Sequence, residues 1–357
     1  MTTNGFNGSR FHNLRSLFSV FSSDLAIDLG TANTLVYAQD RGIVLNEPSV
    51  VAIETINGIK KVKAVGDDAK MMMGKTPDNI EAIRPLRDGV IADIEIAEEM
   101  IKHFIRKVNG KRSMFRYPEI VICVPSGSTS VERRAIRDAA SNAGASQVFL
   151  ILEPMAAAIG ADMPVTEPVG SMVVDIGGGT TEVGIIALKR PTYSISERVG
   201  GDKMDDAIAS YVRMKHNVEI GPVSAERIKK EIGSALSTPE GMTIIGHVGG
   251  RDVTVGNLCE IALTQAEMAD ALHDVVQQIV EVVSRALGHA GPEIASDIIN
   301  RGLVITGGGS LLKNIDTVLA DETGLPVRVA TEPLTCVVLG AGRALEDPEY
   351  RAEFHVV

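Results

Sequence analysis

The sequence predicts an α/β protein built from two similar halves. Predicted strands and helices alternate along both halves of the 357-residue chain, a pattern typical of this fold class. In addition, one strand–turn–strand pattern occurs twice, and its aspartates, Asp28 and Asp175, are 147 positions apart. This repetition suggests a duplication, and we expect a ligand to bind in the crevice between the two halves.

The individual elements follow from hydrophobic periodicity. Short runs of Val, Ile and Leu bounded by Gly, Pro or polar residues indicate strands, and apolar residues spaced three and four apart indicate helices. The predicted strands are residues 25–29, 49–54, 119–124, 148–152, 172–175, 193–199 and 303–306, and the predicted helices are 96–107, 131–143, 225–234 and 266–287. The chain has no Trp, so its core must consist mainly of aliphatic side chains and Met.

Residues 156–161 and 339–345 form two further helical segments that are rich in Ala and Gly. Such small side chains allow two helix backbones to approach closely. If the segments cross at a domain junction, they would form a hinge. Ordinary tight packing within a core explains them equally well.

Each copy of the repeated pattern places a glycine turn between two predicted strands. The turn residues are Gly30, Thr31, Ala32 and Asn33 after Asp28, and Gly177, Gly178, Gly179 and Thr180 after Asp175. Glycine lets the backbone approach a ligand, and successive N–H groups in such a turn form a site for anions. One copy alone is more often an ordinary β-turn. Recurrence with Asp and Thr in register favours phosphate binding, with the two aspartates holding Mg²⁺ through water.

A third glycine turn follows the predicted strand 303–306. It consists of Gly307, Gly308, Gly309 and Ser310 and precedes an apolar helical pattern. A glycine turn that opens a helix is a common site for anions and nucleotides. The three turns together predict a nucleotide site.

Glu153 follows the predicted strand 148–152 and should lie at its carboxyl end. That edge of an open α/β sheet lines the ligand crevice. A carboxylate there can position or deprotonate the water that attacks a γ-phosphate, and Thr180 or Thr181 can help hold that water. The competing interpretation of Glu153 is a carboxylate that interacts favourably with a helix N-terminus.

Two other segments are candidates for nucleotide contacts. Glu226, Lys229 and Lys230 lie near one face of a predicted helix, where they could contact a ribose and adenine, although a solvated charged face is the more usual explanation. Gly201 and Asp202 follow the predicted strand 193–199 and form another turn suited to lie near phosphate.

Composition excludes several classes of protein. The net charge of −11 argues against nonspecific binding of nucleic acid. The cysteines Cys123, Cys259 and Cys336 are far apart and lack metal-ligand spacing, so we interpret them as buried apolar residues in a reducing compartment. No apolar run approaches the roughly 20 residues that a membrane-spanning helix needs.

The N-terminal segment has a different character. Residues 1–23 contain Arg10 and Arg15 and no acidic residue, and residues 1–10 are predicted to be mobile. The apolar residues that follow have helical spacing and predict a short amphipathic helix over 11–21: Phe11, Leu14, Leu17, Phe18 and Phe21. This helix either binds a membrane surface or packs on its own domain.

Taken together, the motifs resemble those of the actin, sugar-kinase and heat-shock-chaperone ATPase superfamily, and within it the MreB family of bacterial actins. The resemblance covers nearly the whole chain from Asp24 to about Asp347. Its most specific stretches are residues 27–34, 42–51, 83–93, 153–160, 170–182, 200–205, 225–233 and 306–312.

The resemblance implies an actin-like fold of two ribonuclease-H-like domains with a nucleotide in the cleft between them. The expected first domain is residues 24–155, to which the segment 334–357 returns, and the expected second domain is 156–333. The implied ligands are ATP or ADP with Mg²⁺. The implied nucleotide contacts are Thr31, Ala32 and Asn33, Gly177 to Thr180, Glu226, Arg227, Ile228 and Lys229, and Gly307 to Ser310. Asp28 and Asp175 would hold Mg²⁺ through water, and Glu153 with Thr180 would place the attacking water.

The resemblance also implies function. It predicts slow ATP hydrolysis coupled to polymerisation into double protofilaments on the inner face of the cytoplasmic membrane, where the family organises cell-wall synthesis and maintains rod shape. Cell-wall elongation proteins are the implied partners. Family members also place an apolar loop tip against the bilayer, which here corresponds to Met114 and Phe115. Leu152 is a departure, because the family often has a second acid at this position.

Two other functions within the superfamily are less compatible with the sequence. A small-molecule kinase needs an additional acidic base for its substrate hydroxyl, and no such motif is evident. A chaperone ATPase needs a substrate-binding region, and about ten residues after the predicted helix 339–346 are too few to form one.

Overall fold

The computed structural model describes residues 24–87, 89–109 and 118–351. The predicted amphipathic helix at 11–21, with Phe11, Leu14, Leu17, Phe18 and Phe21, therefore lies outside the described residues. The same holds for the predicted loop tip, Met114 and Phe115. Within the described part of the chain, no helix combines the length and apolar character needed to cross a bilayer.

Two five-stranded sheets with the same topology form the frame of the molecule. In each sheet the central strand pairs antiparallel with the next strand of the chain and parallel with a strand that comes later. The first sheet has the order β10-β9-β1-β2-β3, with β1 (Leu25–Leu29), β2 (Asn33–Ala38), β3 (Gly42–Pro48), β9 (Glu119–Val124) and β10 (Gln147–Leu152). The second has the order β13-β12-β11-β17-β18, with β11 (Ser171–Ile176), β12 (Thr181–Ala187), β13 (Arg190–Glu197), β17 (Leu303–Thr306) and β18 (Val327–Val329). The duplication predicted from the repeated turns is thus visible in the strand order.

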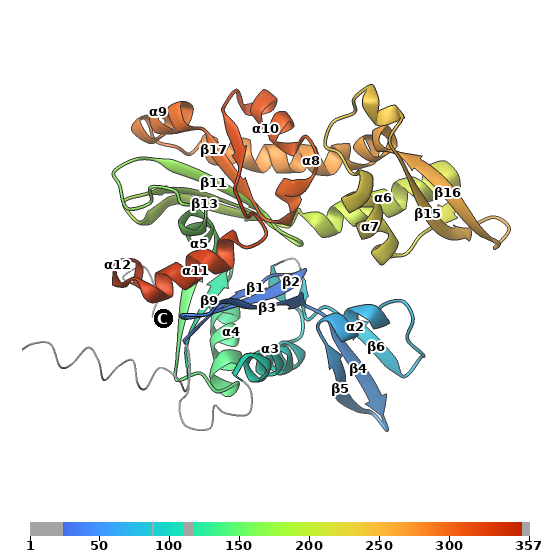
Figure 1. Ribbon diagram of the computed structural model, residues 1–357, viewed down its shortest axis with the longest axis horizontal. Helices are drawn as coiled ribbons and strands as arrows, with labels where there is room; N and C mark the ends of the chain where they lie inside the picture. Colours follow the sequence, from blue (N-terminus) through green and yellow to red (C-terminus); the bar gives the residue numbers. More distant parts are fainter. Residues whose placement is uncertain (1–23, 88, 110–117, 352–357) are drawn as a thin grey trace, which may run out of the picture.

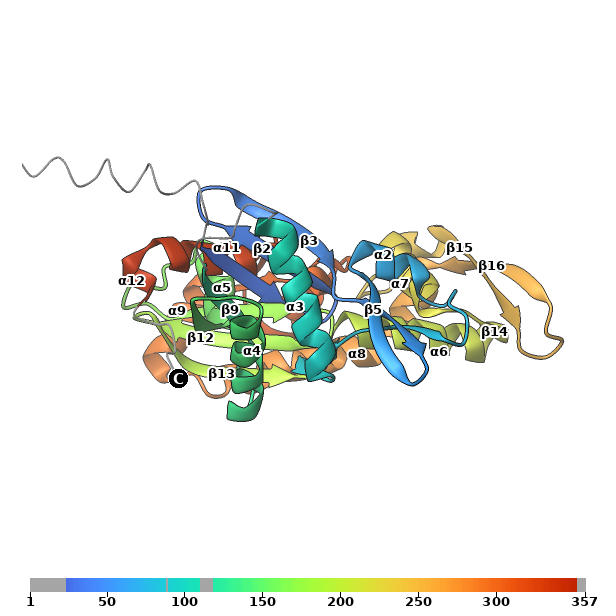
Figure 2. The same cartoon turned by 90° about the horizontal axis from the view of Figure 1, so that it is seen from below.

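Helices cover both sheets and fill the space between them (Figure 1). The first sheet packs against α3 (Ile94–Asn109) and α4 (Ser130–Asn142), and the second against α8 (Gln265–Leu287), α9 (Pro292–Arg301) and α10 (Ile315–Thr323). Figure 2 shows α3 and α4 side by side along the first sheet. Between the two sheets lie α5 (Glu153–Gly160) and α11 (Cys336–Glu346).

Because side chains on a strand alternate between its two faces, one apolar strand packs against two different hydrophobic cores. Met172 and Val174 of β11 face the core shared with α8, whereas Val173 faces the central core that contains α5 and α11. In β1, Ile27 and Ala26 divide in the same way. Because side chains alternate between faces, a strand covered on both sides is apolar at most positions, and the exceptions here include Asp28 and Asp175 near the strand ends.

The two small-residue helices cross each other at very close range. A Cβ built on Gly340 would lie 1.8 Å from the carbonyl oxygen of Ala156, and one built on Gly160 would lie 1.9 Å from that of Cys336. The close crossing that the hinge interpretation requires is therefore present. Their action as a hinge stays a prediction, as do the domain boundaries.

Each large sheet carries an inserted smaller unit, and both units lie at the same end of the molecule (Figure 1). The first unit contains the sheet β5-β4-β6, and the second contains the sheet β14-β15-β16. The first comprises β4 (Val51–Ile56), β5 (Ile59–Val65), α2 (Asp67–Met72), β6 (Ile80–Ile83), β7 (Leu86–Arg87) and β8 (Val90–Ile91). The second comprises α6 (Gly201–His216), β14 (Val218–Glu219), α7 (Pro222–Ile232), η2 (Glu240–Met242), β15 (Ile245–Asp252) and β16 (Leu258–Thr264).

Most predicted elements are present, and their ends differ for local reasons. The strand predicted at 49–54 begins at Val51, because the backbone N–H of Ser49 instead donates a hydrogen bond to the carbonyl oxygen of Ala32. Helix α7 begins at Pro222, earlier than predicted, since proline is favourable at the first position of a helix. The third glycine turn opens a 3₁₀ helix, η3 (Gly308–Leu311), instead of an α-helix. The chain described ends with α12 (Pro348–Arg351).

Candidate functional site

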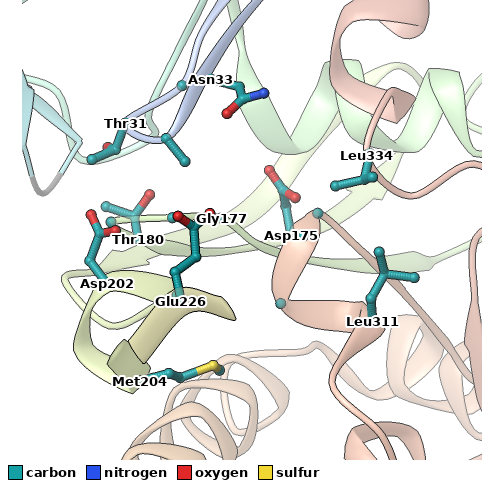
Figure 3. Close-up of a pocket in the computed structure, with 18 of the residues that line it drawn as sticks. Thr31, Asn33, Asp175, Gly177, Thr180, Asp202, Met204, Glu226, Leu311 and Leu334 are labelled. Carbon is teal, nitrogen blue, oxygen red and sulfur yellow. The ribbon is translucent and has the colours of Figure 1, made fainter. Parts of the chain in front are cut away.

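A cavity of about 640 Å³ lies between the two halves, and all three glycine turns line it. This volume is within the range of ligand pockets, about 300–1,000 Å³. Figure 3 shows Thr31 and Asn33 on one side of the cavity and Asp175, Gly177 and Thr180 on the other. The two turns that the sequence places 147 positions apart thus face one another.

The tips of the two hairpins approach so closely that side-chain size is restricted. A Cβ built on Gly178 would lie 2.8 Å from Cβ of Ala32, so a larger residue at either position would separate the hairpins. The second turn is closed by a hydrogen bond of 2.8 Å from the Gly177 N–H to the Thr180 carbonyl oxygen. The result is a rigid floor of backbone amides, which is suited to bind phosphate groups.

The two repeated aspartates share an unusual electrostatic environment. Loss of hydration raises the pKa of Asp28 to about 7 and that of Asp175 to about 8, and Asp28 contributes further to the rise at Asp175. Two carboxylates placed together without a cation therefore retain protons near neutral pH. They fit a bound Mg²⁺, which favours oxygen ligands and keeps several waters. The described residues include no cluster of three or more His, Cys, Asp or Glu that could enclose a metal ion alone.

Glu153 lies where the sequence predicts, at the carboxyl end of β10 and the first residue of α5. It is buried and lines the cavity together with Thr180. Loss of hydration, followed by the charges of Glu182, Asp28 and Asp175, raises its pKa well above the ordinary value. A raised pKa brings a carboxyl group into the range useful for proton transfer near neutral pH.

Helix α6 begins directly beneath the second turn. The N–H groups of Gly201 and Asp202 donate to the carbonyl oxygens of Gly177 and Gly178, at 3.0 and 2.7 Å. Lys229 donates to the Gly201 carbonyl oxygen at 2.7 Å and forms an ion pair with Asp205. Lys229 therefore holds α6 against the turn, in addition to lining the cavity.

The third turn packs against the second sheet in a way that only glycine allows. Gly307 has φ +78°, and a Cβ there would lie 2.4 Å from Oδ1 of Asp175. A Cβ on Gly309 would lie 2.2 Å from the side chain of Ile176. The turn can therefore reach the cavity only without side chains.

Three of the predicted contact residues do not lie in the cavity wall. Ile228 is fully buried in the core of the second half, because it is on the inner face of α7. Arg227 points outward and binds Glu231 and the His247 carbonyl oxygen. Ser310 turns inward and donates to the Gly307 carbonyl oxygen at 2.7 Å. The other predicted nucleotide and metal residues all line the cavity.

Sequence reasoning missed the contacts that cross the opening of the cavity. Arg84 pairs with Asp202 at 2.5 Å, and Lys70 pairs with Glu226 at 3.0 Å, so each ion pair joins the two halves. Their partners are more than a hundred positions apart, and no local pattern in the sequence links them. Gln265, hydrogen-bonded to Lys313, also lines the cavity without a motif to indicate it.

Comparison with known proteins agrees with this architecture. Residues 22–353 match the family model described as MreB/Mbl protein. The chain belongs to the MreB/Mbl family. The cell shape-determining protein MreB of Escherichia coli is 54% identical over 335 residues, which are 93% of this chain and 96% of that protein. The cell shape-determining protein Mbl of Bacillus subtilis is 45% identical, over 92% of this chain and 97% of that protein.

Solved structures match more than nine tenths of this chain. MreB5 of Spiroplasma citri bound to ADP has a TM-score of 0.86 and 35% identity, and covers 93% of this chain and 98% of its own. The same protein was also solved bound to AMPPNP, with a TM-score of 0.85. The MamK double helical filament shares 21% identity and the fold, with a TM-score of 0.76. The actin-like fold predicted from the motifs is confirmed.

Proposed function

We propose that this MreB/Mbl protein binds ATP with Mg²⁺ in the central cavity, hydrolyses it slowly and couples hydrolysis to filament assembly. The observation that carries the proposal is the meeting of the two equivalent hairpin turns across one cavity, with Ala32 against Gly178. The ADP and AMPPNP complexes of the Spiroplasma citri relative support a nucleotide as the ligand.

Within this proposal, each group in the cavity has a distinct role. The amides of the two turns hold the phosphates, and Asp28 with Asp175 would hold Mg²⁺, which neutralises charge on the phosphate oxygens. Glu153 orients the attacking water and takes its proton, and Thr180 keeps that water in line. Loss of hydration in the cavity strengthens these interactions.

We place the resulting filament, a double protofilament, on the inner face of the cytoplasmic membrane, where it organises cell-wall synthesis and maintains rod shape together with elongation proteins. The names of the Escherichia coli and Bacillus subtilis relatives support a role in cell shape. The apolar residues of 11–21 and the pair Met114 and Phe115 are the proposed membrane contacts.

The wall of the cavity gives little support to the alternative of a small-molecule kinase. A kinase of this fold class would need a carboxylate free to accept a proton from a substrate hydroxyl. Outside the two Asp turns, the acids of the described wall other than Glu153 have cationic partners: Asp202 with Arg84, Asp205 with Lys229, Glu226 with Lys70, and Glu231 with Arg227. Glu153 is then the remaining carboxylate, and at the carboxyl end of β10 it is placed to activate a water molecule.

Sedimentation with Mg²⁺ and ATP, alongside phosphate release, tests the proposal. Polymer should pellet with ATP, should co-pellet with anionic liposomes, and should release phosphate. ADP in place of ATP is the matched control and should leave less protein in the pellet. A protein that stays monomeric with ATP yet turns it over would contradict the coupling to assembly and would point to a separate phosphoryl acceptor.

A further inference from the structure

Glu182, on β12, is a carboxylate that the proposed mechanism does not use. It is completely buried, yet it does not line the cavity. One of its oxygens accepts a hydrogen bond of 3.0 Å from the backbone N–H of Ser126. Loss of hydration raises its pKa, and hydrogen bonds with Ser196 and Ser126 partly offset that rise. Burying a carboxylate costs free energy even when it is hydrogen-bonded, so the presence of this side chain calls for an explanation.

The hydrogen bond from Ser126 joins the two halves of the molecule behind the cavity. Ser126 follows β9 of the first sheet, whereas Glu182 belongs to the second. The residue before Ser126 is Pro125, which lines the cavity. The carboxylate of Glu182 therefore anchors, from the opposite half, a loop that forms part of the site.

That loop packs into the same corner as Thr180. A Cβ built on Gly89 would lie 3.5 Å from Cγ of Pro125 and 2.7 Å from Cγ2 of Thr180. Pro125, Gly89 and Thr180 therefore form one packed corner at the floor of the cavity. A displacement of the Ser126 loop would be transmitted to Thr180 through these contacts.

Glu182 also acts on Glu153. Among charged groups, it makes the largest contribution to the rise in the pKa of Glu153, after loss of hydration. Leu152, which precedes Glu153, is apolar and supplies no charge there. The second acid near Glu153 in this chain is therefore supplied by the neighbouring sheet.

We propose that Glu182 is a positioning residue for hydrolysis, whose hydrogen bond to the Ser126 N–H fixes Thr180 and Glu153 relative to each other across the two halves. The inference rests on the proposed ATPase function. It separates binding from chemistry, because many backbone amides of the two turns would hold the nucleotide, whereas the alignment of the attacking water depends on the placement of Thr180 and Glu153.

The test compares two variants of nearly equal shape in the full chain. Glu182→Gln keeps an oxygen that can accept from the Ser126 N–H, and Glu182→Met fills the same space without an acceptor. Glu293→Met is the matched control, because it makes the same change at an exposed position of α9 outside the cavity wall. Affinity for a fluorescent ATP analogue, single-turnover phosphate release and the unfolding temperature are measured for each.

Glu182→Met should slow phosphate release at least about 10-fold while the affinity for nucleotide stays within about 3-fold of the original. Glu182→Gln and Glu293→Met should release phosphate within about 3-fold of the original chain. Equal rates in Glu182→Met and the original chain would overturn the inference alone. So would a Gln variant as slow as the Met variant, or a Met variant that loses binding and folding in parallel. Absence of phosphate release from the original chain would overturn the proposed function as well.

Discussion

At the scale of single residues, the most informative groups are carboxylates whose pKa values are raised by burial. Asp28, Glu153 and Asp175 all line one cavity, and each has a raised pKa because the cleft removes hydration. In water these groups would be ordinary anions with pKa values near 4. Their environment makes two of them suitable for a cation and one for proton transfer.

Replacement of Glu153 should separate binding from hydrolysis. Glu153→Ala is expected to slow phosphate release about 10²-fold or more, because loss of a positioned general base typically costs 10²–10⁴ in rate. Affinity for the fluorescent ATP analogue should change little, since the turns that hold the phosphates are intact. Glu293→Ala, on α9 and outside the cavity wall, is a suitable control. A variant that hydrolyses ATP at the original rate would contradict the role of Glu153.

The raised pKa values of the two repeated aspartates predict that the stability of the free protein falls with pH, whereas its stabilisation by Mg²⁺ rises. Their pKa values, about 7 and about 8, exceed the ordinary value of 3.8, so the folded protein holds protons that the unfolded chain releases. Stability from these protons is present below pH 4 and lost as the pH rises through 7 and 8. Thermal unfolding of the nucleotide-free protein should therefore occur at lower temperature at pH 8.5 than at pH 6.

Stabilisation by Mg²⁺ with ATP should increase over the same interval, because ionised carboxylates hold the cation better. The double variant Asp28→Asn with Asp175→Asn should weaken both trends, and the part that remains belongs to groups such as Glu153, whose pKa is also raised. Unfolding temperatures that change with pH equally in the variant and the original chain would assign the effect to other groups.

At the scale of elements, close approach of backbones determines where glycine and alanine are found. Helices α5 and α11 cross with Gly340 against Ala156 and Gly160 against Cys336. The two hairpins meet with Gly178 against Ala32. In each case the contact joins parts of the chain that lie more than a hundred positions apart, so one added methyl group acts on the arrangement of the whole cleft.

Gly340→Ala is therefore expected to be costly although alanine favours helices. Its Cβ would lie 1.8 Å from a backbone oxygen of α5, and the helices would have to separate. Overpacking of this kind costs about 1–3 kcal/mol, which should lower the unfolding temperature by several degrees. Gly249→Ala is the matched control, because the nearest atom to its Cβ is 4.0 Å away. Equal unfolding temperatures for the two variants would contradict the close crossing.

At the scale of the whole molecule, the two halves are joined at the back by α5 and α11 and across the opening by the pairs of Arg84 with Asp202 and Lys70 with Glu226. A ligand in the cavity would contact both halves at once. Nucleotide occupancy can therefore influence the relative placement of the two halves. Within the proposed function, filament assembly would depend on that placement.

Membrane binding should depend on assembly. Burial of one apolar side chain contributes about 1.5–3 kcal/mol, so one short amphipathic helix and a two-residue tip would give weak, reversible binding. A filament presents many such anchors together and should bind strongly. Co-pelleting with anionic liposomes is expected to be high for ATP-assembled protein and low for monomer. Removal of residues 1–21 should reduce it, and equal binding of monomer and filament would contradict this prediction.

Local sequence patterns were sufficient to predict the strands, the helices and the candidate chemical groups that belong to short motifs. The strands at 119–124 and 303–306 match to the residue, because runs of β-branched residues between turns have few other solutions. The glycine turns and the carboxylates Asp28, Asp175 and Glu153 could also be predicted, since glycine and carboxylate at strand ends are visible without knowledge of the fold.

Tertiary packing alone shows which side chains reach the cavity and which form contacts between the two halves. Ile228 and Arg227 stand beside Glu226 in sequence, yet α7 directs one into the core and the other outward. Arg84 and Glu182 lie within stretches that carry the family resemblance, but no local pattern shows their partners, which folding brings to each from the opposite half. Side-chain direction and contacts over a hundred residues depend on how elements pack, and a one-dimensional pattern does not contain that information.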